Sequence, residues 1–358
     1  MADRASHGRG HLPARQGTRV RTACERVVLL ACAVVAGVTL ARADEITVYS
    51  IREASLVAPV TAAFTAASGI AVKLVFVEDN LVKRLTSEGE TSPADVLLTI
   101  GLDKTTQLSR QGLTQAIAST ALAQAEPGSL RGADAQWVAL AVRPRVVMVR
   151  SDSLLEGIDY ENLADPAWRG KLCMRAALHQ NNVALVAAYL VHHGAEATEA
   201  WLKGLKANLV HRPAGKDNDV IREIAEGGCA IGIANTVALA QLREGRDGDD
   251  WRVAAQKVKA VPTVFKGGGA HVNLTAAAIA KHAPHRAAAQ RFIDFLVSPG
   301  AQTVFAAAEL EYPVLAAAER APIVAAIGTF PADALPIDDI AAQQQAAIAL
   351  IRKVGFDE

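Results

Sequence analysis

The sequence is poor in aromatic residues, in cysteine and in net charge. Only 4% of its 358 residues are aromatic, and the tyrosines are Tyr49, Tyr160, Tyr189 and Tyr312. Its formal net charge of +0 argues against a nucleic-acid-binding protein, which usually carries a basic excess. Four Cys exclude a disulfide-dense framework, and a hydrophobic fraction of 51% excludes intrinsic disorder.

Long hydrophobic runs are also scarce. The run from Val27 to Ala41 follows an Arg-rich start and has about 15 residues, fewer than the roughly 20 that a membrane-spanning helix needs. Ala41-Arg42-Ala43 then matches the small-x-small rule for signal-peptide cleavage. We therefore expect residues 1–43 to be a cleaved secretory signal peptide and the mature chain to be periplasmic. The alternative is an uncleaved membrane anchor.

Removal of this leader changes the charge and the cysteine count. The leader holds seven Arg and two acidic residues, so the mature chain keeps 30 basic and 35 acidic residues and has a net charge of −5. Only Cys173 and Cys229 remain, in a compartment where disulfides persist. They form either a bridge or two buried free thiols, the latter being common for Cys in strands. Two Cys without clustered His do not predict a zinc site.

The mature chain alternates short β-branched runs with Ala-rich helical stretches. This pattern predicts a parallel sheet covered by helices on both faces. Before residue 150 it gives strands at 45–50, 71–77, 95–100, 137–142 and 145–149, and helices at 55–68, 81–88 and 103–110. Beyond it come strands at 171–176, 207–212, 229–235 and 272–280, and helices at 182–193, 218–226, 286–296, 301–308 and 337–353.

Two such α/β sets in an exported chain suggest two lobes that face a shared crevice. Ligands of open α/β sheets bind outside the carboxyl ends of the strands. Lobes joined by crossing strands can close on a ligand by hinge motion.

Several ordered motifs make the chain resemble the periplasmic ferric-iron-binding proteins of ABC importers. The resemblance covers essentially all of the mature chain and implies a type II periplasmic-binding-protein fold, with two doubly wound α/β lobes joined by crossing hinge strands. It places one lobe at 44–142 plus 272–315 and the other at 143–271 plus 316–358. The motifs are VYS (48–50), SPADVLLT (92–99), LADPAWRGKL (163–172), WLKGLK (201–206), IANT (233–236) and EYPVL (311–315).

The iron ligands of that family do not carry over. The family's adjacent tyrosine pair falls on Val237 and Ala238, and a further tyrosine of some members falls on Asn181. A ligand position at the start of the first helix falls on Glu53, and a carboxylate position after the SPADV strand falls on Ile100. Because ferric iron prefers hard oxygen donors such as phenolates, we expect no metal site of the family's kind.

The predicted crevice instead carries basic and neutral polar residues. Arg52 could bind an anion, and Arg145 could face the crevice or form a structural ion pair. Most of the other candidates also have a structural reading as helix caps or surface ion pairs. The candidate ligand-binding residues are Arg52, Glu53, Arg145, His179, Gln180, Asn181, Asp217, Asn235, Thr236 and His271.

We therefore expect the solute-binding subunit of an ABC importer, monomeric and without a cofactor, that binds a small anionic or chelated-iron ligand. Its partner would be a permease of the inner membrane. Three alternatives stay open: ferric iron held by a different ligand set, a sensing subunit of a membrane receptor, and an enzyme. No Ser-His-Asp, Cys-His or paired-carboxylate motif supports the enzyme.

Overall fold

The computed structural model describes residues 45–78, 80–118, 130–132 and 134–358. The expected signal peptide, residues 1–43, lies outside these ranges. Among the described residues, no helix combines the length and apolar character needed to cross a membrane. Residues 44–358 group together as one compact unit.

The first strands form a parallel sheet with helices between them, as the alternation predicted. Their order is β2-β1-β3, with β11 antiparallel to β3 on the far side. Helix α2 ends where Gly69 adopts a left-handed conformation, which glycine reaches without a Cβ penalty. The elements are β1 (Glu45–Ser50), α2 (Ala54–Ser68), β2 (Ala71–Phe76), α3 (Leu81–Glu88), η1 (Gly89–Thr91), β3 (Val96–Ile100), α4 (Leu102–Arg110), β4 (Thr114–Gln115) and β11 (Val272–Ala280).

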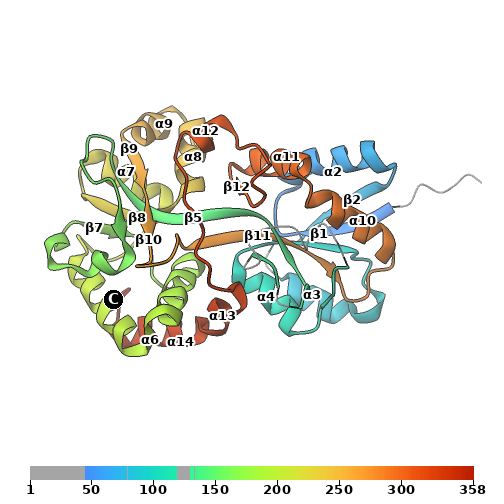
Figure 1. Ribbon diagram of the computed structural model, residues 1–358, viewed down its shortest axis with the longest axis horizontal. Coiled ribbons are helices and arrows are strands. Elements are labelled where there is room, and N and C mark those ends of the chain that lie inside the picture. The colour runs from blue at the N-terminus through green and yellow to red at the C-terminus, as the bar shows by residue number, and fades with distance from the viewer. Residues whose placement is uncertain (1–44, 79, 119–129, 133) are drawn as a thin grey trace, which may run out of the picture. The chain divides into compact units, whose positions relative to one another are not determined.

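Strand β5 (Val138–Arg150) joins this sheet to the rest of the unit. The two strand-like runs expected at 137–142 and 145–149 are parts of this one strand. Up to Pro144 it pairs with β11 and with β12 (Tyr312–Pro313), and from Arg145 onward it pairs with β8 (Ile231–Asn235) and β9 (Val258–Val261). Figure 1 shows β5 and β11 running between the two groups of elements. The partner change lies near the lobe boundary predicted at 142/143, and the lobe assignment itself stays a prediction.

The second group surrounds the parallel pair of β7 and β8, and its longest helix is α6. Gly194 interrupts the helical geometry of α6 with φ 77°. The elements are β6 (Ile158–Asp159), η3 (Tyr160–Ala164), η4 (Pro166–Trp168), β7 (Leu172–Met174), α6 (Gln180–Asn208), α7 (Asp217–Glu226), α8 (Thr236–Glu244), α9 (Asp249–Gln256) and β10 (Thr263–Val264).

The strand predicted at 207–212 is wrong. Helix α6 continues to Asn208, and only a single bridge between Leu172 and Leu209 follows. The buried face of Trp201 and Leu205 extends the helix, and the Asn208 amide donates to the carbonyl of Leu163 at 2.9 Å. These tertiary contacts outweigh the local strand propensity of the segment.

The C-terminal segments pack on both groups of elements. Helix α11 packs on α2, α12 on α8, α14 on α6, and α13 contacts both α6 and α4. The helix predicted at 337–353 is divided at Gln343 into α13 and α14. These elements are α10 (Arg286–Leu296), α11 (Pro299–Glu309), α12 (Pro322–Ala325), α13 (Ile337–Ala342) and α14 (Gln344–Val354).

Candidate functional site

The candidate crevice is built from segments that directly follow strands. Arg52 and Glu53 come after β1, Gly101 comes after β3, and Asn235 ends β8. A Cβ atom placed on Gly101 would lie 4.0 Å from the side-chain amide carbon of Gln180, at the start of α6. The β3–α4 turn of the first group therefore meets the α6 start of the second group.

Arg145 is the hub on the side of the second group. Its side chain has an exposed fraction of 0%, and it sits on β5 where the strand changes partners. Its guanidinium donates to Asn182 Oδ1 at 2.6 Å, to Asp217 Oδ2 at 3.0 Å and to Asn235 Oδ1 at 3.3 Å. Arg145 thus fixes the ends of three segments, which makes it a positioning residue for the crevice.

Arg52 holds a similar place in the first group. Its guanidinium forms buried ion pairs with Glu309 and Glu311 and donates to Thr275 Oγ1 at 2.6 Å. Arg143 Nε lies 3.5 Å from Glu311, so two arginines and two carboxylates share this buried cluster. Burial, opposed by Arg52, raises the pKa of Glu309 to about 7, so its carboxyl is partly protonated at neutral pH.

The start of α6 carries the three neighbouring candidates His179, Gln180 and Asn181. His179 is the N-cap, and its Nδ1 accepts from the backbone N–H of Asn181 at 3.2 Å. Burial and the nearby Arg175 lower the pKa of His179 to about 4, so the imidazole is neutral at neutral pH. His179 therefore acts as a helix cap. Asn181 is buried, and its Oδ1 has no hydrogen-bond partner among the described residues.

Asp217 and Thr236 occupy helix starts in the same region. Asp217 accepts from Arg145 and, through Oδ2, from the backbone N–H of Asn235 at 3.0 Å. Burial alone would raise the pKa of Asp217, but Arg145 and Arg175 hold it below its ordinary value. The buried Oγ1 of Thr236 makes no hydrogen bond to another described residue.

The side chains of the other two candidates, Glu53 and His271, make no hydrogen bond to these arginines among the described residues, but the backbone carbonyl of His271 accepts from the backbone N–H of Arg145 at 2.9 Å. Glu53 is exposed at the N-cap of α2 and makes no capping hydrogen bond with its side chain. His271 is buried in the return crossing, where its backbone N–H donates to the hydroxyl of Tyr160 at 3.0 Å. Burial and then Arg145 lower the pKa of His271 to about 3, so it remains neutral.

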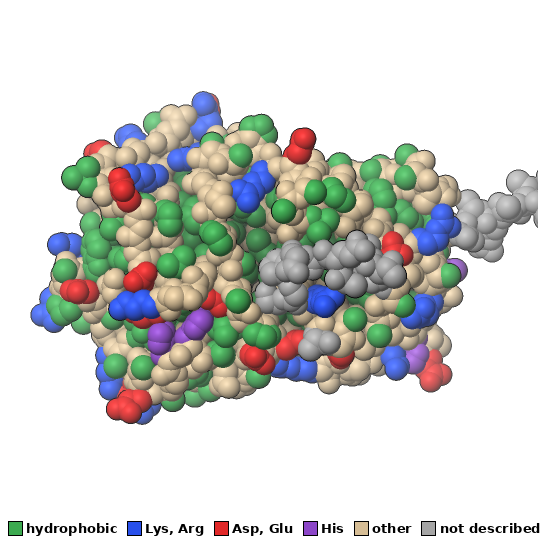
Figure 2. Space-filling model, in the orientation of Figure 1, with side chains coloured by type: hydrophobic (Ala, Val, Ile, Leu, Met, Phe, Trp, Pro, Cys, Tyr) green, Lys and Arg blue, Asp and Glu red, His purple; other side chains and the backbone are tan. Residues whose placement is uncertain are grey.

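The ion-paired groups of the crevice include one more arginine than carboxylates. Arg52, Arg143, Arg145 and Arg175 face three carboxylates, those of Asp217, Glu309 and Glu311. Buried donors remain unused there, since Arg143 Nε and Arg175 Nε make no hydrogen bond within the described part of the chain. Elsewhere, charged side chains of both signs are interspersed on the face seen in Figure 2.

Comparison with known proteins assigns the chain to a family. Residues 92–327 match the model of the bacterial extracellular solute-binding proteins. The curated "Iron uptake protein A1" of Synechocystis sp. is 35% identical over 87% of this chain and 88% of its own length. A solved "Bordetella ferric binding protein" is 44% identical, with a TM-score of 0.85, over 88% of this chain and 100% of that chain. A Trichodesmium structure described as in complex with iron and citrate is 32% identical, with a TM-score of 0.83, over 87% of this chain and 99% of that chain.

The chain belongs to the periplasmic ferric-iron-binding protein family. The type II fold of this solute-binding protein and its periplasmic location agree with the expectations from the sequence. Its relatives are solute-binding proteins and not enzymes, in agreement with the prediction. Such proteins bind a small ligand and work with an inner-membrane permease.

The four tyrosines of this solute-binding protein make contacts within the described part of the chain. Burial is the main factor that raises the pKa of all four phenols, which disfavours the ionised form that binds ferric iron. The positions matched to the family's pair, Val237 and Ala238, lie in the first turn of α8. The tyrosine contacts are Tyr49 to Glu88 Oε1 at 2.9 Å, Tyr160 to the Arg145 carbonyl at 2.7 Å, Tyr189 stacked on Trp201 at 4.1 Å, and Tyr312 to the Gly328 carbonyl at 3.2 Å.

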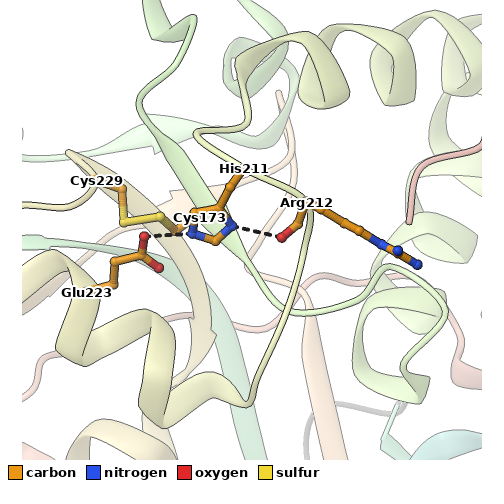
Figure 3. Close-up of a disulfide and its surroundings, with 5 residues drawn as sticks. All are labelled: Cys173, His211, Arg212, Glu223 and Cys229. Carbon is orange, nitrogen blue, oxygen red and sulfur yellow. Dashed lines mark hydrogen bonds and ion pairs between the residues drawn. A yellow bond between two sulfur atoms is a disulfide. The ribbon is translucent and has the colours of Figure 1, made fainter. Parts of the chain in front are cut away.

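A disulfide joins Cys173 and Cys229, which selects the bridged alternative left open by the sequence. It lies beside His211 and Glu223 (Figure 3), whose side chains pair at 2.7 Å between Nε2 and Oε1. Across the described ranges, Cys173, His211 and Glu223 form the only group of three potential metal ligands within 4.8 Å. Because Cys173 is oxidised and has no thiolate to offer, this group does not make a metal site.

The sequence did not single out Arg175, Glu309 or Glu311 as site residues. Arg175 directly follows β7, and the rule that ligands bind beyond strand ends would have found it. Glu311 begins the EYPVL motif, but its pairing with Arg52 spans 259 residues of sequence and left no local signal.

Proposed function

We propose that this protein delivers a small anionic or chelated ligand to the permease of an ABC importer, and that it does not hold bare ferric iron through tyrosinates. The excess of arginine among the ion-paired groups of the crevice carries this proposal. Buried guanidinium groups bind carboxylates and phosphates through paired, charge-assisted hydrogen bonds. They repel a bare trivalent cation.

The available carboxylates support the same view. Glu309 and Glu311 are paired with Arg52, and Asp217 is paired with Arg145. Each would have to leave an arginine uncompensated in a buried site before it could bind a metal, which is costly. The phenols that ferric iron prefers are hydrogen-bonded or stacked elsewhere in the described chain.

Arg175 is the residue through which we would test anion binding. It is largely buried, its Nε has no hydrogen-bond partner among the described residues, and its nearest ion-pair distance, to Asp217, is 3.7 Å. Arg169 lies six residues earlier, is exposed, and provides a matched control. Isothermal titration with phosphate, oxalate and citrate should show binding that Arg175→Gln weakens at least tenfold and Arg169→Gln leaves unchanged.

One result of the same titrations would overturn the proposal. Tight binding of ferric iron with a visible phenolate-to-iron charge-transfer band, and no heat from any anion, would overturn the proposal. Titration with ferric citrate and with citrate alone separates a chelate from a free anion. The relative described as in complex with iron and citrate makes the chelate the more specific alternative.

Two further points remain proposals. We propose that the protein acts as a monomer, which light scattering on the mature chain would test. Import and sensing share the same ligand capture, so the neighbouring genes distinguish them: a permease and an ATPase accompany an importer, and a histidine kinase accompanies a sensor.

A further inference from the structure

A pocket of about 530 Å³ is lined by residues of α4, of the start of α6, and of α13 and α14. It is therefore formed by both groups of elements. Five of its lining residues are glutamines, from three different segments of the chain. They are Gln107, Gln111, Gln180, Gln344 and Gln345.

The polar groups of this pocket are mainly neutral. The lining includes two charged residues, Asp103 and Arg110. Burial raises the pKa of Asp103 above its ordinary value. Arg110 donates to the carbonyls of Asp338 at 2.9 Å and Ala341 at 3.2 Å. None of the five glutamine amides makes a side-chain hydrogen bond to another described residue.

An amide group both donates and accepts hydrogen bonds, as a hydroxyl group does. A pocket lined by several free amides therefore matches a chain or ring that bears several hydroxyls. The lining also includes the apolar side chains of Leu178, Val183 and Ile348, which can pack against the C–H groups of such a ligand. A purely apolar ligand that displaced water from these amides would leave them without partners, at a cost.

The pocket adjoins the arginine crevice at the start of α6. Gln180 lines the pocket, and the next residue, Asn181, has a buried Oδ1 without a hydrogen-bond partner among the described residues. Asn182 then accepts from Arg145 Nε at 2.6 Å. One short segment thus connects the neutral pocket to the positively charged crevice.

We propose that the ligand is a polyhydroxylated organic anion, with its acidic group at the arginines and its hydroxyls in the glutamine pocket. This inference rests on the proposed function, because it extends the same site. The volume fits it, since pockets for small organic ligands measure about 300–1,000 Å³, far more than an inorganic oxyanion fills. The acidic group is a carboxylate or a phosphate, and the test separates the two.

The test compares ligands that share a charge and differ in hydroxyls. The carboxylate pair is gluconate and hexanoate, which have the same number of carbons. The phosphate pair is glucose 6-phosphate and inorganic phosphate. In calorimetric titrations of the mature chain at fixed ionic strength, the hydroxylated member of one pair should bind at least tenfold more tightly than its partner.

Substitutions of single glutamines test whether the pocket binds the hydroxyl groups. Gln107→Leu and Gln180→Leu should each weaken binding of the hydroxylated ligand at least fivefold and leave that of its partner unchanged. Gln256→Leu is the matched control, because Gln256 is exposed at the end of α9 and is absent from the pocket lining. Gln107 is also exposed, so its replacement keeps the test available if Gln180→Leu does not fold.

The outcomes separate this inference from the proposed function. Equal affinity within both pairs overturns the inference and leaves an anion-binding crevice intact. If none of the four compounds binds, the inference is overturned, and the proposed function is overturned only if oxalate, citrate and ferric citrate also fail to bind. Glucose binding as tightly as glucose 6-phosphate refutes the role of the arginines, and variants that weaken both members of a pair equally refute the role of the glutamines.

Discussion

Removal of the Asp217 carboxylate should destabilise the whole fold. Asp217 has an exposed fraction of 5% and is the buried carboxylate paired with Arg145, whose own side chain is fully buried. In Asp217→Ala, Arg145 keeps only uncharged partners, including Asn182 and Asn235, and its positive charge remains buried. The backbone N–H of Asn235 also loses its acceptor.

The expected loss of unfolding free energy follows from this geometry. Breaking a buried ion pair by removing one partner costs about 3–5 kcal/mol, because the remaining charge is uncompensated. The free energy of unfolding of a native protein is about 5–15 kcal/mol, so this change should remove a large fraction of it. Urea or guanidinium unfolding, followed by circular dichroism, measures it directly as a lower midpoint at an unchanged slope.

Asp152 provides the control for this experiment. It pairs with Arg150 at 3.0 Å, the same distance as in the buried pair, but both side chains are exposed. Solvent screens such a pair, so Asp152→Ala should leave the midpoint nearly unchanged. The reasoning is refuted if the two variants unfold at the same denaturant concentration.

The same residue predicts a dependence on pH. Because the pKa of Asp217 is lower in the folded protein, its stabilising effect is complete above the unfolded value of about 3.9 and disappears as pH falls through the folded value. The difference in stability between the wild type and Asp217→Ala should therefore shrink below about pH 4. A difference that stays constant to pH 2 would contradict this assignment.

Three other perturbations have defined outcomes. The disulfide between Cys173 and Cys229, 56 residues apart, should contribute up to about 4 kcal/mol, so reduction or Cys229→Ser should lower the unfolding midpoint. Cys24→Ser, which lies in the expected leader, should leave the midpoint unchanged. Because burial raises the pKa of Glu309, ionisation of its carboxyl destabilises the folded protein, and the wild type should lose stability as pH rises through about 7. Glu309→Gln cannot ionise at this position, so its stability should not fall over that pH range. An unchanged pH profile in this variant would contradict the assignment. Arg110→Ala should speed hydrogen exchange in α13, whose carbonyls it binds, and leave exchange in α9 unchanged.

The strand and helix pattern was predictable where local and tertiary preferences agree. The β-branched runs at 45–50 and 272–280 form β1 and β11 at the residues expected. The prediction failed at 207–212, where α6 continues to Asn208, whose side-chain amide donates to the carbonyl of Leu163. Single-sequence patterns do not contain that long-range contact.

The site was predictable only in part, for a similar reason. Positions after strands, such as Arg52 and Asn235, follow from the general rule for open α/β sheets. The partners of these residues do not follow from the rule, because Arg52 and Glu309 are separated by 257 residues in the sequence. The glutamines of the proposed ligand pocket also come from separate segments, so no local motif marks them.

The placement of β11 has a consequence for how the chain acquires its structure. β11 lies between β3 and β5 in the sheet, yet it follows β5 by more than 120 residues in the sequence. Until residues 272–280 have been synthesised, β3 and β5 each present an unpaired edge, and non-local pairing of this kind slows folding. The pairing of β3 with β11 and of β11 with β5 therefore cannot form until residues 272–280 have been synthesised, late in translation.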